Sequence, residues 1–206
     1  MPTVIKWAMV PRVKPMSLRL VRDAFDDPAY LFELKHDGFR AVCYIEKGQC
    51  HLISRNLRSL RFESLQKTLA KLPVKEAVLD GEIICLDQHG VSRFNELLER
   101  SKEPVFYAFD LLWLDGADLK DIPLIERKNR LSELVQSSGC NRLLYAQHIE
   151  EYGRHFFKEI CERDLEGIVA KRKMSVYKPG GYGWLKIKNK ANTQAEGRHE
   201  LLTKRK

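Results

Sequence analysis

The sequence lacks a long apolar run, and this absence excludes a membrane-spanning helix. One of its longest apolar stretches, residues 108–114, is interrupted by Asp110 and falls well short of the roughly 20 residues that a span requires. The N-terminal segment MPTVIKWAMVPRVKP contains basic residues, but it has neither the apolar core nor the small-residue cleavage site of a secretory signal. We therefore expect an intracellular, cytoplasmic protein.

The sequence lacks closely paired cysteines, and this absence argues against two common uses. The five cysteines are scattered and never form a CxxC pair, so neither a zinc site nor a disulfide framework is indicated. We expect reduced and mostly buried thiols. These residues are Cys43, Cys50, Cys85, Cys140 and Cys161.

The sequence also lacks internal repeats, low-complexity tracts and a proline-rich linker that would divide it. A chain of 206 residues with 44% hydrophobic content can bury a substantial core. We expect one catalytic-sized domain over residues 1–190. Residues 191–206 lose apolar periodicity and end in basic residues, which indicates a short helical or frayed tail with no room for a further domain.

Positive charge is in excess, because 36 Lys and Arg face 28 Asp and Glu and the net charge is +8. This balance favours an anionic partner such as nucleic acid, although a solvated basic face has the same composition. The pI of 9.2 does not distinguish DNA from RNA.

Periodicity predicts an α+β fold of mostly antiparallel sheet flanked by helices. Short β-branched or aromatic runs predict strands at 30–34, 42–45, 51–53, 78–86, 105–114, 166–171 and 184–188. Apolar residues at helical spacing predict helices at 62–72, 94–100, 124–136 and 153–163.

Lys35 is the first candidate for chemistry, within the segment Glu33-Leu34-Lys35-His36-Asp37-Gly38-Phe39-Arg40. It follows an apolar strand and precedes an Asp-Gly turn signal, a position that presents a side chain. A lysine amine is nucleophilic only when neutral, and partial burial beside other cations lowers its pKa. By spacing alone, a KxDG hairpin is more often a solvated turn than a catalytic site.

Carboxylates and aromatics interrupt later strands. Glu82, in the run 78–83, has the chemistry to accept hydrogen bonds from a ribose or to hold a divalent cation, but a turn between edge strands fits equally. Tyr107 and Phe109 face one side of a strand, where one of them would stack on a purine or both would pack in the core. Ser54-Arg55-Asn56 adds a cation between these segments.

Two further segments carry charge. Glu166 begins an apolar strand. Lys186 and Lys188 share one face of another strand, where the two lysines would either bind a phosphate or protect an edge strand from aggregation. A phosphate loop of the form GxxxxGK[ST] is absent, and Gly180, Gly181 and Gly183 do not supply one. This absence argues against a P-loop ATPase.

In this order, KHDGFR, SRN, LDGEI, FYAFDLLWLDG, EGIVAK and WLKIKN resemble the sequential motifs of the covalent nucleotidyltransferases, specifically the ATP-dependent DNA ligases. The resemblance covers about residues 32–189, and the segments FDLLWLDG and LDGEI are similar to those of the bacterial ligases of repair and end joining. It implies an ATP-grasp-like nucleotidyltransferase domain that uses ATP and Mg²⁺ or Mn²⁺. It also implies nicked or broken duplex DNA as partner, with a separate DNA-binding or end-joining protein as a further one, and nucleoid association if the protein is bacterial.

The same resemblance implies roles residue by residue. Lys35 would form the phosphoamide with AMP, and Glu33 would recognise the adenine amino group. Arg40 and Arg55 would contact ribose or phosphate, Glu82 the ribose hydroxyl region, and Phe109 would stack on adenine. Glu166, with Glu82, would hold a divalent cation, and Lys186 and Lys188 would bind the α-phosphate.

The sequence departs from the resembled family in two places. The OB-fold domain that usually follows WLKIKN is not expected in the 17 residues after Asn189, and the segment 177–184 lacks the usual arginine-serine pair. Full strand joining by this chain alone therefore stays open. An RNA ligase or guanylyltransferase, and a non-catalytic DNA-end binding module, are the alternatives.

Overall fold

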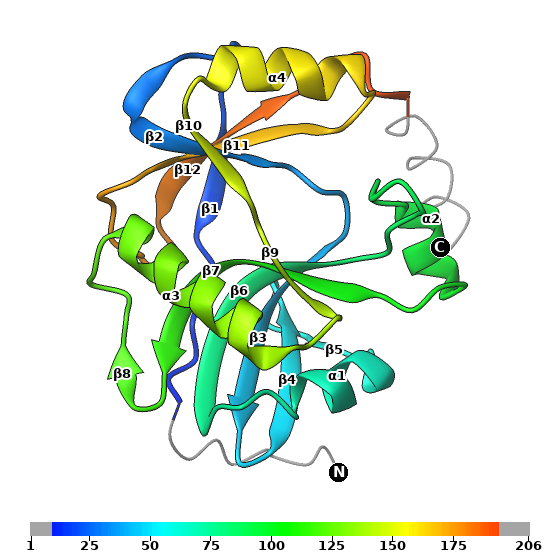
Figure 1. Ribbon diagram of the computed structural model, residues 1–206, viewed down its shortest axis with the longest axis vertical. Coiled ribbons are helices and arrows are strands. Elements are labelled where there is room, and N and C mark those ends of the chain that lie inside the picture. The colour runs from blue at the N-terminus through cyan, green and yellow to red at the C-terminus, as the bar shows by residue number, and fades with distance from the viewer. Residues whose placement is uncertain (1–9, 194–206) are drawn as a thin grey trace.

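The computed structural model describes residues 10–193, which form two β-sheets and four helices (Figure 1). The strands are β1 (Ser17–Leu20), β2 (Asp27–Leu34), β3 (Phe39–Glu46), β4 (Gln49–Ser54), β5 (Ser59–Leu60), β6 (Glu76–Ile84), β7 (Val105–Leu114), β8 (Ala117–Asp118), β9 (Leu143–Tyr145), β10 (His148–Glu151), β11 (Gly167–Arg172) and β12 (Tyr182–Lys188). The helices are α1 (Glu63–Leu69), α2 (Phe94–Glu99), α3 (Leu124–Ser138) and α4 (Gly153–Glu162).

The seven-stranded sheet has the order β5-β4-β3-β6-β7-β8, and β9 pairs with β7 in parallel. Its strands alternate between two buried faces, because successive side chains point to opposite sides. On β3, Cys43 and Ile45 pack in the core beneath α1, α2 and α3, while Val42 and Tyr44 point toward the second sheet. Both faces of this sheet are therefore apolar.

The five-stranded sheet has the order β1-β12-β11-β2-β10. The β1–β12 pair is parallel and the other pairs are antiparallel. Helix α4 covers its outer face (Figure 1), where Ile160 packs with Phe32 and Ile168. Burying side chains of this size contributes about 1.5–3 kcal/mol each.

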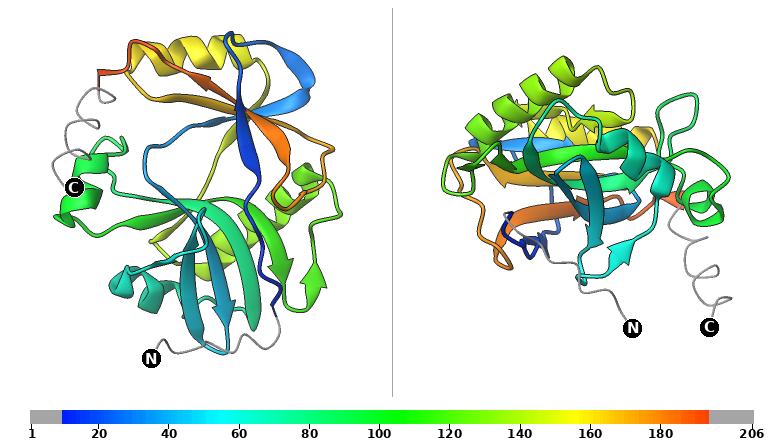
Figure 2. Two further views of the ribbon diagram at one scale, coloured as in Figure 1. Left: turned by 180° about the vertical axis from the view of Figure 1, so that it is seen from behind. Right: turned by 90° about the horizontal axis from the view of Figure 1, so that it is seen from below.

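The core between the sheets contains residues from both, including Val78 on one side and Val169 and Trp184 on the other. Seen from behind, the segment that leads into β1 runs from the seven-stranded sheet to the edge of the five-stranded sheet (Figure 2). In this segment the backbone N–H of Met16 donates to the Tyr177 hydroxyl at 3.1 Å. The two sheets thus enclose a common interior.

The α+β prediction with mostly antiparallel sheets is confirmed, and each predicted strand and helix is present, most of them with shifted ends. The periodicity did not predict the short strands β1, β5, β8, β9 and β10, because with two to four residues each they are too short to carry a clear alternation. The strands divide between two sheets. The predicted tail lies mostly outside the described residues. No helix within residues 10–193 has the length and apolarity to span a membrane.

The expected hairpin at Asp37-Gly38 is wrong, because β2 and β3 belong to different sheets. Residues 35–38 connect the five-stranded sheet to the seven-stranded sheet. Gly38 serves close packing here, since a Cβ at this position would lie 2.2 Å from the Ile83 carbonyl oxygen. Lys35 therefore stands where the chain crosses between sheets.

Candidate active site

A cavity opens between the two sheets around the residue 35–38 connection. Strands of the five-stranded sheet contribute one wall, strands of the seven-stranded sheet contribute the other, and the connection closes one side. The lining residues are Leu18, Glu33, Leu34, Val169, Lys171 and Trp184 from the first sheet, Arg40, Glu82, Tyr107 and Phe109 from the second, and Lys35 and His36 from the connection.

Lys35 is held at this cavity by backbone and side-chain contacts to the start of β11. Its backbone N–H donates to the Gly167 carbonyl at 2.9 Å, and its Nζ donates to Glu166 Oε2 at 2.7 Å. The Lys35 side chain is 19% exposed and that of Glu166 is 9% exposed. The amine is therefore positioned by a carboxylate while it keeps access to solvent.

Glu82 approaches the same amine from β6 in the other sheet. Burial raises the pKa of Glu82 to about 8, and the nearby carboxylates of Glu166 and Asp80 add to this effect. The cations Lys35 and Arg40 oppose it. Two carboxylates thus share one small region beside Lys35, an arrangement that favours a proton or a cation.

Several charged residues act on Lys186, which lies near Glu166. Burial lowers the pKa of Lys186, and the charges of Lys188, Lys35 and Arg55 lower it further, while Glu166 acts in the opposite direction. Lys186 is partly buried, and Lys188 and Arg55 are exposed. These three residues do not line the cavity, and the positive charge that they bring together around Lys186 suits an anionic group.

Arg40 and Phe109 lie on the seven-stranded side of the cavity. The Arg40 Nε and Nη2 donate to the two carboxylate oxygens of Asp80 at 3.1 and 2.8 Å, and Nη1 donates to the Met16 carbonyl at 2.6 Å. The guanidinium stands 5.4 Å from the Phe109 ring centroid and 5.2 Å from that of Trp184. Arg40 therefore supports the aromatic wall, and much of its donor capacity is already used.

The inner end of the cavity holds a buried ionic triad of Glu33, Lys128 and Lys171. Glu33 Oε1 accepts a hydrogen bond from Lys128, and Glu33 Oε2 is ion-paired with Lys171 at 2.6 Å. The pKa of Glu33 is lowered: burial by itself would raise it, and the two lysines outweigh burial. The carboxylate is held ionised two residues before Lys35.

Lys171 joins the triad to the aromatic wall. Its Nζ lies 4.4 Å from the Phe109 centroid and 4.1 Å from the Trp184 centroid, within cation–π range. Across the strands, Glu33 pairs in register with Val169, and Val169 pairs with Lys186. The register therefore places Glu33, Val169 and Lys186 side by side on three neighbouring strands.

Sequence reasoning assigned no role to His36, Lys128, Lys171 or Trp184, although these residues belong to the site or its support. A signal existed for Lys128. Leu124, Arg127, Lys128 and Leu131 follow the spacing of a buried helix face, and all four are buried. Charged residues at apolar positions require partners, which is the mark of a buried network.

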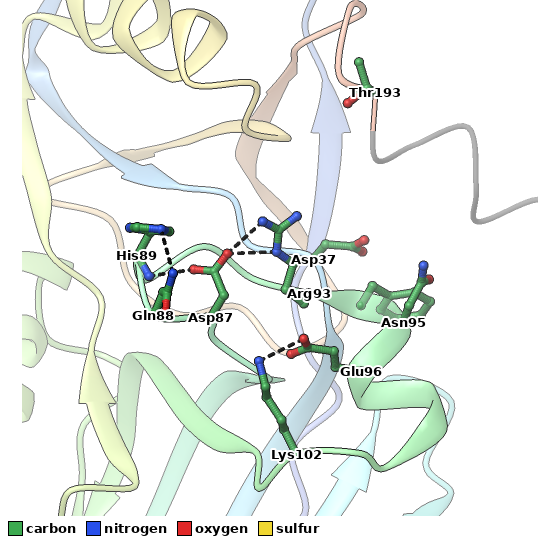
Figure 3. A pocket seen from close by; sticks show the side chains of 10 residues that line it. Asp37, Asp87, Gln88, His89, Arg93, Asn95, Glu96, Lys102 and Thr193 are labelled. Carbon is green, nitrogen blue, oxygen red and sulfur yellow. Dashed lines mark hydrogen bonds and ion pairs between the residues drawn. The ribbon is translucent and has the colours of Figure 1, made fainter.

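A larger hollow of about 820 Å³ lies beside α2 (Figure 3). Its charged side chains largely pair with one another, Arg93 with Asp87 and Lys102 with Glu96, at 2.8 and 2.9 Å. Asp87 Oδ1 also accepts backbone bonds from His89 and Val91. The hollow does not contain Lys35, so the reactive groups of the sequence motifs gather in the smaller cavity.

The paired sheets with a lysine at their junction define a nucleotidyltransferase domain fold. Residues 12–188 match the family model of the ATP-dependent DNA ligase domain. The chain belongs to this family.

Relatives and solved structures agree with this membership. The chain is 33% identical over 167 residues to the multifunctional non-homologous end joining protein LigD of Pseudomonas aeruginosa. This alignment covers 77% of the chain and 20% of that protein. It is 35% identical over 182 residues to a DNA ligase of Natronomonas pharaonis, covering 78% and 32%.

Mycobacterial DNA ligase D complexed with ATP and MES superposes with a TM-score of 0.76 at 29% identity, covering 85% of this chain and 60% of that one. The ligase domain of M. tuberculosis LigD gives 0.74 at 30% identity, covering 85% and 59%. The chain thus spans about a fifth to a third of the length of these curated relatives.

Proposed function

We propose that this chain is the adenylate-transferring catalytic domain of an ATP-dependent DNA ligase, with Lys35 as the residue that accepts AMP. The observation that carries the proposal is the Lys35 amine, held at 2.7 Å from Glu166 at the edge of a cavity with an aromatic wall and a buried carboxylate. Family membership and the mycobacterial relative in complex with ATP support ATP as the nucleotide.

The base and sugar would occupy the cavity between the sheets. Phe109 would stack on adenine opposite Val169, and Glu33 would accept a hydrogen bond from the adenine amino group. Glu82 would bind the ribose hydroxyls. This order leads from the inner end of the cavity to Lys35, as a nucleotide with its phosphates at the mouth requires.

The phosphates would meet the cations around Glu166. Lys186 and Lys188 would bind the α-phosphate, and Arg55, together with the remaining donors of Arg40, would contact ribose or phosphate. These positive charges would offset the negative charge that grows as pyrophosphate departs. The excess of cations at this end of the cavity favours a polyanion.

In the reaction, the neutral Lys35 Nζ attacks the α-phosphorus in line with the departing pyrophosphate. One N–P bond forms and one P–O bond breaks, so pyrophosphate takes the electron pair and AMP stays on the lysine. One proton must leave the Nζ ammonium before the attack, and a second must leave the nitrogen once the N–P bond has formed. Glu166 Oε2, which already accepts a hydrogen bond from Nζ, would take the first, and solvent would take the second.

A divalent cation fits the residues present, although no group of three or more metal-ligating side chains occurs in the described part of the chain. Glu82 and Glu166 would supply two carboxylates near Lys35, and substrate oxygens would complete the ligand set, as is usual for Mg²⁺. When bound, Mg²⁺ or Mn²⁺ would supply charge neutralisation for the phosphates.

Incubation with ATP and Mg²⁺, followed by intact-mass spectrometry, tests the adenylation step. The wild type should gain the mass of one AMP, and Lys35→Ala should not. GTP in a parallel sample tests the guanylyltransferase alternative. A wild-type protein that stays unmodified with ATP would falsify the enzymatic proposal.

A chase with DNA tests the later steps. The AMP would pass to a DNA 5′-phosphate, and the adjacent 3′-hydroxyl would displace it to seal the nick. We expect sealing of nicked duplex DNA by this chain alone to be weak and salt-sensitive, because backbone contacts by a small basic surface dominate binding. Strong sealing at high salt would contradict this expectation, and transfer to nicked RNA alone would favour an RNA ligase.

We also propose residues 1–190 as the catalytic domain and residues 191–206 as a basic tail. Asn192 and Thr193, at its start, bond to Asp164 beside α4. A separate DNA-binding or end-joining protein would be the partner in DNA repair, as the end-joining name of the LigD relative suggests.

A further inference from the structure

Lys128 reaches the nucleotide cavity from behind its wall. It lies on α3, is fully buried, and is absent from the cavity lining. Its Nζ donates to Glu33 Oε1 and to the Ala146 carbonyl at 2.8 Å, and it stands 4.6 Å from the Tyr145 ring centroid. Glu33 is the one cavity-lining group among these contacts.

The two oxygens of Glu33 have different surroundings. Oε1 is held by Lys128 from outside the cavity, whereas Oε2 is paired with Lys171, which itself lines the cavity and lies against Phe109 and Trp184. A ligand in the cavity therefore meets Glu33 on the side of Oε2, and Lys128 fixes the opposite side.

We propose that Lys128 is a positioning residue that aims the ionised Glu33 carboxylate at the base and so selects purines that carry a 6-amino group. This inference rests on the proposed function, in which Glu33 faces the adenine amino group. A carboxylate accepts hydrogen bonds and does not donate them, so it favours the amino group of adenine and opposes the 6-oxo group of guanine.

The neighbouring buried cation shows what a purely structural role looks like. Arg127 donates to both carboxylate oxygens of Asp110 and to the carbonyls of Ile122 and Ser175. None of these acceptors lines the nucleotide cavity. These two adjacent residues on α3 therefore have different roles. Arg127 anchors α3 to the seven-stranded sheet, and Lys128 contacts a ligand-facing group on β2.

Replacing Lys128 need not leave a lone buried charge. The triad has two cations and one anion, so Lys128→Met leaves Glu33 paired with Lys171. Such a variant removes the outer restraint on Glu33 and keeps an ion pair in place. Arg130→Met is the matched control, because it removes a cation from the exposed face of the same helix.

The test compares single-turnover formation of the lysyl nucleotide from ATP and from purine riboside 5′-triphosphate, which lacks the 6-amino group. The ratio of the second-order rate constant for ATP to that for the analogue should fall about tenfold in Lys128→Met, as expected for a weakened hydrogen bond to a charged group. It should fall similarly in Glu33→Gln and stay unchanged in Arg130→Met. The double variant of Lys128 and Glu33 should lose no further selectivity.

Equal losses with ATP and the analogue would overturn the inference, because a merely structural residue affects both substrates alike. If Lys128→Met does not fold, Lys128→Gln, which retains a donor for Ala146, is read by the same ratio. Failure of the wild type to form any lysyl nucleotide would instead refute the proposed function.

Discussion

Two groups of charged residues, one at the cavity that contains Lys35 and one at its inner end and behind its wall, differ in exposure. At the mouth, Lys35 and Glu166 have side chains that are 19% and 9% exposed, and Glu82 and Lys186 stand close by. At the inner end, the side chains of Lys128 and Glu33 are 0% and 3% exposed, and Arg127 and Asp110 are both fully buried.

The difference follows from what each group has to do. Groups at the mouth would gain and lose charge during adenylation, so they need solvent access and neighbours that tolerate a change. At the inner end, Glu33, held by Lys128 and Lys171, would recognise an uncharged base, whereas Arg127 and Asp110 anchor α3. The low polarity around all five residues makes each pair strong and each lone charge costly. We name these the mouth cluster (Lys35, Glu82, Glu166, Lys186) and the inner cluster (Glu33, Lys128, Lys171, Asp110, Arg127).

The largest effect on stability should come from breaking the inner cluster at Asp110. Asp110→Asn leaves the Arg127 guanidinium buried without its counter-ion, so the free energy of unfolding should fall by about 3–5 kcal/mol. Urea unfolding followed by circular dichroism measures this loss.

Glu166→Gln is the matched change in the mouth cluster. Its Lys35 partner keeps solvent access, so the loss of stability should be about 1 kcal/mol while adenylation is strongly reduced. Equal destabilisation by Asp110→Asn and Glu166→Gln would remove the distinction between the clusters.

An intermediate effect should appear at His36, beside Lys35. Burial, with the Lys35 charge as a second cause, lowers the pKa of His36 to about 4 from its ordinary 6.5. Between pH 6.5 and 4 the unfolded chain binds a proton that the folded protein does not, so stability falls as the pH falls through this window. From pH 7.5 to 5, the wild type should lose about 2 kcal/mol more than His36→Gln.

Urea unfolding at both pH values measures this difference between the two proteins. Parallel losses of stability in wild type and His36→Gln would show that His36 titrates in the folded protein as it does in the unfolded chain. The mouth would then tolerate a second positive charge beside Lys35.

The smallest effect should come from an exposed pair that belongs to neither cluster. Lys158 and Glu162 are one turn apart on α4, 3.7 Å from each other, with side chains 72% and 55% exposed. Lys158→Ala should change the free energy of unfolding by less than about 0.5 kcal/mol, as thermal unfolding at low and moderate salt can show. A loss above 1 kcal/mol would mean that exposure does not determine how much each ion pair contributes to the free energy of unfolding.

Much of the fold could be predicted because its strands and helices carry strong local patterns. The run 105–114 forms β7 with the predicted ends, and the helical spacing at 124–136 marks most of α3. The short strands β9 and β10 escaped prediction, since they pair only because other strands place their partners beside them.

The site could be predicted in its parts but not in its contacts. The motifs pointed to Lys35, Glu33, Glu82, Phe109 and Glu166, and the described structure places these five around or beside one cavity. Their roles toward ATP stay predictions. The bidentate ion pair between Arg40 and Asp80 was not predictable, because these residues are 40 positions apart and meet only where β3 lies beside β6.

The sequence by itself determined the chemical groups, the family and the alternation of strands, because these depend on residue types at short spacing. Only the tertiary structure decided that β2 and β3 enter different sheets and that Lys128 from α3 meets Glu33, 95 residues away in the chain. The physical reason is that a buried charge must find a partner in space. Which partner it finds depends on how the sheets and α3 pack.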